Sequence, residues 1–162
     1  MPNTVPVVTP TLEDFEVAEA NVSVIIKETP LLHSSYLSEL TGGDVYLKAE
    51  NLQRTGAYKV RGAYNRMSKL SAQERKRGVV AASAGNHAQG VALAASKLGI
   101  KATIFMPIGA SLPKVQATKG YGAEVVLIGA TFAECLKAAQ EFSAKKNAVF
   151  IPPFDHIDVV VG

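Results

Sequence analysis

The chain has 162 residues, of which 48% are hydrophobic and 19% are charged, and its formal net charge is +3. This length suits a single domain with one core, and the hydrophobic share is too high for a disordered chain. The basic residues are scattered, aromatic residues make up only 7%, and tryptophan is absent. We therefore expect no nucleic-acid-binding surface.

The cysteine content and the N-terminal sequence bear on the compartment. Cys135 is the single cysteine, which excludes an internal disulfide and suits a reducing compartment. Its helical spacing to Ala139 and Phe142 predicts a packing role. The first residues lack the pattern of a secretory signal, and no apolar stretch approaches the roughly 20 residues of a membrane span. We expect a cytoplasmic protein without a membrane segment or a metal site.

The first part of the chain predicts one helix and one strand. Thr11 and Asp14 have the spacing of a capping box, and apolar residues then recur at helical spacing up to Ile26. Residues 41–44, Thr-Gly-Gly-Asp, indicate a turn. Residues 45–50 alternate apolar and polar side chains, which predicts a half-buried strand.

From residue 58 onward, helices and short apolar runs alternate. The predicted buried strands are residues 78–82, 101–106, 124–128 and 148–151. The predicted helices are residues 60–70, 87–98, 112–119 and 132–146, and the second and third end at Gly99 and Gly120. This alternation predicts an α/β fold, with a parallel sheet and helices on both faces. Ligands then bind at the carboxyl ends of the strands.

Two of the loops at that edge carry candidate chemistry. Residues 83–87, Ser-Ala-Gly-Asn-His, lead from a strand into a helix, where free N–H groups and the helix dipole favour an anion. An equally good reading is that Ser83 or Asn86 only caps the helix. Lys59 lies at the start of another helix, where the positive end of the dipole disfavours the protonated amine and favours a nucleophilic one. Taken alone, Lys59 also fits an ordinary solvated lysine.

Both loops match a known family. Residues 50–63, Glu-Asn-Leu-Gln-Arg-Thr-Gly-Ala-Tyr-Lys-Val-Arg-Gly-Ala, closely resemble the lysine motif of fold-type II pyridoxal-phosphate enzymes. Residues 83–90, Ser-Ala-Gly-Asn-His-Ala-Gln-Gly, resemble the asparagine loop of the threonine dehydratase (threonine ammonia-lyase) and serine racemase branch. The resemblance covers nearly all of the chain.

This resemblance implies a role for each residue of the two loops. Lys59 would bind the aldehyde of pyridoxal 5'-phosphate and then act as the base that removes the substrate α-proton. Asn86 would hydrogen-bond the phenolic oxygen of the cofactor, and Tyr58 would pack beside its ring. The pocket for the substrate α-carboxylate would be lined by Ser83, Ala84, Gly85 and His87.

The implied reaction is dehydration and deamination of L-threonine or L-serine, giving 2-oxobutanoate or pyruvate and ammonia. It would place the parent enzyme, a cytoplasmic homo-oligomer, in amino-acid metabolism and isoleucine biosynthesis. A serine racemase-like enzyme is one alternative. Racemases of the eukaryotic type carry a serine where this chain has Ala84, and that hydroxyl is their second acid or base. A non-catalytic α/β interaction module is the other alternative.

The resemblance also implies a division of the chain. Residues 51–152 would form the small α/β domain of a fold similar to that of the tryptophan synthase β chain. Residues 1–50 would pack on a large domain, and residues 153–162 would begin the return to it. In this family the glycine-rich loop for the cofactor phosphate lies further along the sequence, so we expect the 162-residue chain to be inactive alone.

Overall fold

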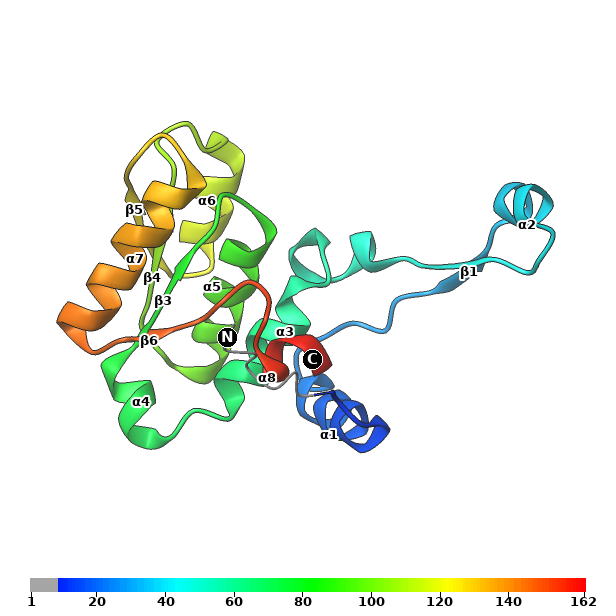
Figure 1. Cartoon of the computed structure of the whole chain (residues 1–162), viewed down its shortest axis with the longest axis horizontal. Coiled ribbons are helices and arrows are strands. Elements are labelled where there is room, and N and C mark those ends of the chain that lie inside the picture. Colours follow the sequence, from blue (N-terminus) through cyan, green and yellow to red (C-terminus); the bar gives the residue numbers. More distant parts are fainter. Residues whose placement is uncertain (1–8) are drawn as a thin grey trace, which may run out of the picture.

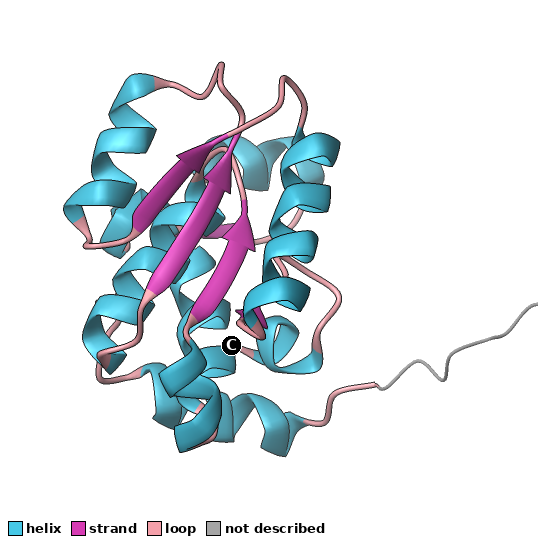
Figure 2. Ribbon diagram, turned by 90° about the vertical axis from the view of Figure 1, so that its left-hand side faces the viewer, coloured by secondary structure: helices cyan, strands magenta, loops and turns pink. Residues whose placement is uncertain are grey.

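The computed structural model describes residues 9–162, and its centre is a four-stranded sheet. The strands lie in the order β5–β4–β3–β6, and each neighbouring pair is parallel. They span β3 (Val79–Ala82), β4 (Ala102–Met106), β5 (Glu124–Leu127) and β6 (Val149–Phe150). Helices flank the sheet on both sides (Figure 2). The predicted α/β class and the four predicted strands are confirmed.

The alternating side chains of β3 build a core on each face of the sheet. Val79 and Ala81 pack on the side of α3 (Lys59–Ser68), α5 (Asn86–Leu98) and α6 (Leu112–Gly120). Val80 and Ala82 pack on the other side, against Cys135 of α7 (Phe132–Lys146). All four residues of β3 are buried. The predicted packing role of Cys135 is thereby confirmed.

The helix ends follow local chemistry with one difference from the prediction. Gly99 adopts the left-handed conformation after α5, as expected, and Asn147 does the same after α7. Helix α6 runs through Gly120 and is capped at Tyr121, and the positive φ angle falls on Gly122. The predicted stop at Gly120 was therefore slightly early, because the left-handed glycine lies two residues further on.

Within the N-terminal third, helix α1 (Leu12–Val22) lies beside α3 and α8 (Ile157–Val161), and the segment after it forms an arm that projects from the α/β unit (Figure 1). Helix α1 begins with the predicted capping box. The arm itself consists of β1 (Leu31–His33), α2 (Ser35–Thr41) and β2 (Tyr46–Lys48), and its two strands pair antiparallel. All residues of both strands are exposed. The predicted half-buried strand is thus shorter and exposed, because no second layer of described residues covers either of its faces.

Short helices complete the chain: η1 (Glu50–Leu52), η2 (Arg54–Gly56), α4 (Ala72–Arg77) and α8 (Ile157–Val161). Helix α8 packs on α3 at Gly62, where an added Cβ would lie 2.5 Å from the carbonyl oxygen of Val159. Glycine is thus required at this contact. Among residues 9–162, no helix has the length and apolar character needed to cross a membrane.

Candidate active site

The strand order places the candidate site at one point of the sheet edge. From β3 the chain continues to β4 and β5 on one side, whereas β6 pairs with the other side of β3. In open parallel sheets, ligands bind at the carboxyl ends of the strands where the order reverses in this way. The segments that leave the sheet there are residues 83–85 after β3 and residues 151–154 after β6.

Lys59 lies at this point as the first residue of α3. Its Nζ donates a hydrogen bond to the carbonyl oxygen of Pro153 at 2.8 Å and lies 5.1 Å from the ring centroid of Tyr58. The lysine is half-buried, and it lines a cavity of about 230 Å³ together with Tyr58, Pro153 and Phe154. The amine therefore lies in a cavity wall. The alternative interpretation, an ordinary solvated lysine, would have left it fully exposed.

The position of Lys59 depends on a close contact between α3 and α5. A Cβ added to Gly90 in α5 would lie 3.0 Å from the carbonyl carbon and oxygen of Lys59 and 3.1 Å from the amide nitrogen of Val60. Only a glycine lets the two backbones approach this closely. Gly90, which belongs to the second motif, therefore allows α5 to pack directly against the backbone of Lys59 in the first motif.

The loop before α5 has no side-chain cap. The N-cap position is held by Gly85, and neither Ser83 nor Asn86 caps the helix. Instead, the Ser83 hydroxyl accepts a hydrogen bond from the Gly85 N–H at 3.2 Å. Asn86 is exposed, and its side chain has no hydrogen-bond partner among residues 9–162. The capping alternative is therefore wrong, and Ala84 and Asn86 are accessible to a ligand.

His87 is buried directly behind this loop, with an exposed fraction of 4%. Its Nε2 lies 3.0 Å from the carbonyl oxygen of Ile151. Because a carbonyl only accepts, Nε2 carries the proton and Nδ1 is left as an acceptor, and Nδ1 has no partner among the described residues. Burial, assisted by the charge of Lys59 and opposed by the hydrogen bond to Ile151, lowers the pKa of His87 to about 4. His87 is therefore neutral near pH 7.

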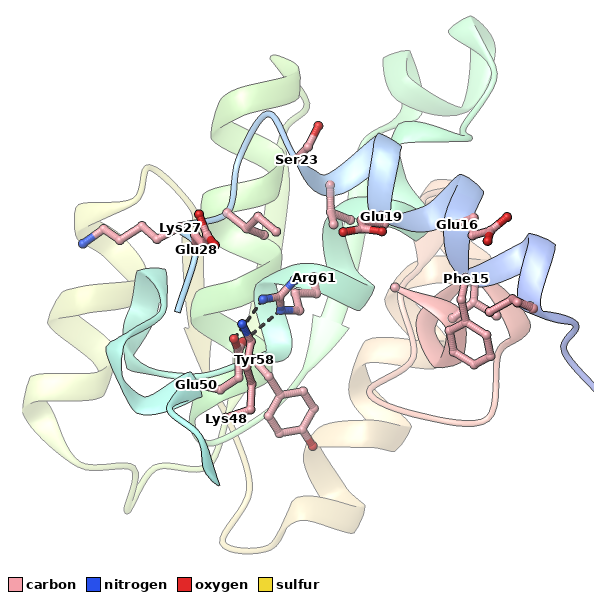
Figure 3. A pocket seen from close by; sticks show the side chains of 15 residues that line it. Phe15, Glu16, Glu19, Ser23, Lys27, Glu28, Lys48, Glu50, Tyr58 and Arg61 are labelled. Atoms are coloured by element: carbon pink, nitrogen blue, oxygen red, sulfur yellow. Dashed lines mark hydrogen bonds and ion pairs between the residues drawn. The ribbon is translucent and has the colours of Figure 1, made fainter. Parts of the chain in front are cut away.

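A larger cavity of about 750 Å³ lies beside α1, on the other side of Tyr58 (Figure 3). Arg61 donates two hydrogen bonds to Glu50 there, at 2.9 and 2.8 Å, and Thr29 donates a third at 2.7 Å. The Arg61 guanidinium and the Thr29 hydroxyl overcome the effect of burial and lower the pKa of Glu50 to about 2. This ion pair joins the N-terminal segment to α3.

The structure brings the two predicted loops to one site and adds groups that side-chain motifs do not reveal. The carbonyl oxygens of Ile151 and Pro153 bind His87 and Lys59, and a backbone carbonyl has no residue signature. Lys114 of α6 is a further addition, because its side chain lies over Gly85. No cluster of three potential metal ligands occurs within residues 9–162.

Comparison with known proteins gives a consistent result. The family described as "Pyridoxal-phosphate dependent enzyme" matches residues 22–162. The L-threonine ammonia-lyase of Thermotoga maritima is 54% identical over 152 residues, which are 94% of this chain and 38% of the relative. The chain spans less than half the length of this curated relative.

Two solved structures are also similar. Serine racemase from Dictyostelium discoideum matches with a TM-score of 0.86 and 35% identity, over 96% of this chain and 50% of that one. Threonine deaminase isoform 2 from Solanum lycopersicum matches with a TM-score of 0.82 and 38% identity, over 100% of this chain and 51% of that one. The fold therefore corresponds to about half of each of these proteins.

Proposed function

The chain belongs to the pyridoxal-phosphate-dependent enzyme family, and on this basis we propose that it supplies the lysine-bearing part of a threonine and serine ammonia-lyase. The enzyme would dehydrate and deaminate L-threonine to 2-oxobutanoate, or L-serine to pyruvate, with release of ammonia. The observation that carries the proposal is the position of the Lys59 amine. It lies at the carboxyl ends of β3 and β6, beside the Ser83–His87 loop. The similarity to the L-threonine ammonia-lyase of T. maritima supports this choice of reaction.

The residues at this edge fit pyridoxal 5'-phosphate. A half-buried primary amine at a cavity wall suits an aldehyde, and the side chain of Asn86, unpartnered within residues 9–162, suits the phenolic oxygen. Tyr58, with an exposed fraction of 56%, offers an aromatic face next to the amine. When bound, the cofactor would supply a ring that delocalises negative charge from the substrate α-carbon.

The remaining steps fall to side chains and backbone of this chain. The Ser83–His87 loop would bind the substrate α-carboxylate through N–H groups at the start of α5, where the helix dipole adds to the attraction. The amine of Lys59 would take the α-proton at Nζ. Loss of the β-hydroxyl as water, followed by hydrolysis, then yields the 2-oxo acid and ammonia. Neutral His87 would position the loop, because its N–H is bound to Ile151.

Ala84 favours dehydration over racemisation. A racemase needs an acid or base on each face of the α-carbon, and Ala84 has no hydroxyl to serve on the second face. The similarity to the D. discoideum serine racemase nevertheless makes racemisation the second candidate. Measuring D-serine formation beside pyruvate formation separates the two, and we expect pyruvate to exceed D-serine at least about tenfold.

We also propose a wider setting for this enzyme. Residues 1–50 would pack on a second domain and residues 153–162 would lead towards it, with the exposed apolar side chains of the arm at that contact. Residues 51–152 would form the small domain. The working enzyme would be a cytoplasmic homo-oligomer of amino-acid metabolism that serves isoleucine biosynthesis through 2-oxobutanoate. Residues 1–8 lie outside the described part of the chain.

The test uses a completed enzyme, which we define as this chain joined to the part of the T. maritima relative that it does not match. With cofactor and L-threonine, we expect 2-oxobutanoate from the completed enzyme and none from its Lys59→Ala variant or from the 162-residue chain alone. Borohydride reduction followed by peptide mapping should place the cofactor on Lys59. A cofactor adduct on another lysine would sink the site assignment, and turnover by the Lys59→Ala variant would refute the role of the amine.

A further inference from the structure

Lys114 lies across the candidate carboxylate loop without a partner. It is the third residue of α6, which begins beside the carboxyl end of β4. A Cβ added to Gly85 would lie 3.4 Å from Nζ of Lys114, 3.7 Å from its Cδ and 3.8 Å from its Cε. The side chain therefore runs over the bare backbone of Gly85 and ends there. Within residues 9–162, its Nζ forms no hydrogen bond or ion pair.

The location of this lysine runs against helix electrostatics. The N-terminal end of a helix carries partial positive charge and favours acidic side chains. Helices α1 and α7 follow this preference with acidic residues in their first turns, whereas α3, which begins with Lys59, and α5 have none there. The first turn of α6 has no acidic residue and holds Lys114 instead. The N-terminal end of α5 at Gly85 and the ammonium group of Lys114 thus bring positive charge to the same place. Among the described residues, no anion pairs with Lys114.

The loop itself contains no cation. Four of its residues, Ser83, Ala84, Gly85 and Asn86, are uncharged, and the fifth, His87, is neutral near pH 7 because burial lowers its pKa to about 4. The Lys59 amine is assigned to the cofactor. A substrate carboxylate bound at this loop would therefore meet only neutral donors, unless a neighbouring element supplied a charge.

We propose that Lys114 is a substrate-binding residue whose ammonium group pairs with the α-carboxylate held by the Ser83–His87 loop. This inference rests on the proposed function and deepens it, because it assigns a charged partner to the substrate. An ionised donor forms shorter and stronger hydrogen bonds to a carboxylate than a neutral one does. The bare backbone of Gly85 leaves room for the lysine to approach the loop.

The experiment compares variants of the completed enzyme loaded with cofactor. Lys114→Met keeps the length of the side chain and removes its charge, whereas Lys114→Arg keeps the charge. Lys97→Met is the matched control, because Lys97 is an exposed lysine in the last turn of α5, at the end of that helix away from the Ser83–His87 loop. We expect Lys114→Met to raise KM for L-threonine about tenfold to hundredfold, with kcat changed less than about threefold. Lys114→Arg should recover most of the loss, and Lys97→Met should leave KM unchanged.

A second readout separates carboxylate binding from a structural effect. L-alanine and L-alaninamide differ in the charged group alone, and each is measured as a competitive inhibitor. We expect the preference for L-alanine over L-alaninamide to fall about tenfold in Lys114→Met, which a general distortion of the site would not cause. An unchanged preference together with an unchanged KM would overturn the proposal, as would an equal loss for acid and amide.

Failure of this inference is distinct from failure of the proposed function. If the completed enzyme carries cofactor on Lys59 but forms no 2-oxobutanoate, the proposed reaction is wrong. The role of Lys114 is then measured by titrating L-alanine and L-alaninamide against the cofactor absorbance. Should Lys114→Met fail to fold, Lys114→Gln replaces it in both measurements, with the same expected loss of preference for the acid.

Discussion

The sheet of the α/β unit and the ribbon of the arm are both built from apolar strands, yet their surroundings are opposite. Strand β3 is buried along its whole length between two helical layers. Strands β1 and β2 are exposed along theirs, and the arm displays the large apolar side chains of Leu31, Leu32, Tyr36, Leu40, Tyr46 and Leu47. A two-stranded ribbon alone is marginally stable in water. Stability therefore comes from the layers that cover a strand, and a bare apolar ribbon indicates a surface for contact.

The largest expected difference between the two regions comes from truncating one side chain in each. Ile104 in β4 is fully buried, and Leu32 in β1 is half exposed. We expect Ile104→Ala to lower the free energy of unfolding by about 3 kcal/mol, because it leaves a cavity between packed layers. Leu32→Ala should lower it by less than about 0.5 kcal/mol. Urea denaturation of the 162-residue chain measures both, and similar losses would show that the arm is part of the cooperative core.

A smaller difference is expected for glycines. Gly90→Val inserts a side chain where Cβ alone would lie 3.0 Å from the backbone of Lys59, and we expect a loss of about 2 kcal/mol from overpacking. Gly43→Val in the arm meets no atom within 4 Å and should cost less than about 0.5 kcal/mol. Thermal unfolding of both variants tests this. In the completed enzyme, Gly90→Val should also weaken cofactor binding, since the lysine backbone must shift.

The smallest effect concerns the joint between the regions, the Glu50–Arg61 ion pair. The pKa of Glu50 is lowered from 4.5 to about 2 in the folded chain, so between these values the unfolded chain binds more protons. Stability should therefore fall as the pH drops from about 4.5 to about 2. Glu50→Gln should cost about 1 kcal/mol at pH 6 and flatten this acid dependence. Urea midpoints at pH 6 and pH 3 measure the change, with Glu39→Gln on the exposed arm as control. An acid dependence as steep as that of the unmodified chain would contradict the assignment.

Much of the α/β unit follows from the sequence, because each of its signals is local. Buried strands give continuous apolar runs, and left-handed residues such as Gly99 end helices in a recognisable way. The arm was harder to predict, since alternation in residues 45–50 indicates one apolar face but carries no information on what covers it. Helices α2, α4 and α8 were missed because they have at most seven residues each and show too few turns of periodicity.

The candidate site was predicted only as far as its side chains are distinctive. The lysine and asparagine motifs identified the two loops, and the strand order brings them together. The carbonyl bonds of Ile151 and Pro153 depend on where the chain returns after β6, which no local pattern reveals. Lys114 lacks a motif of its own, and its relation to Gly85 appears only when α6 is placed beside the loop.

The hydrogen bond from Lys59 to Pro153 also has a consequence for the timing of biosynthesis. The two residues are 94 positions apart, and β6, which leads to Pro153, pairs directly with β3. At about 5 to 20 residues per second, a ribosome needs roughly 5 to 20 s to extend the chain from one residue to the other. Throughout that interval the lysine lacks its carbonyl partner, and once β3 has been made, the edge of β3 that pairs with β6 stays open. A nascent chain therefore completes this wall of the site only after β6 emerges from the ribosome.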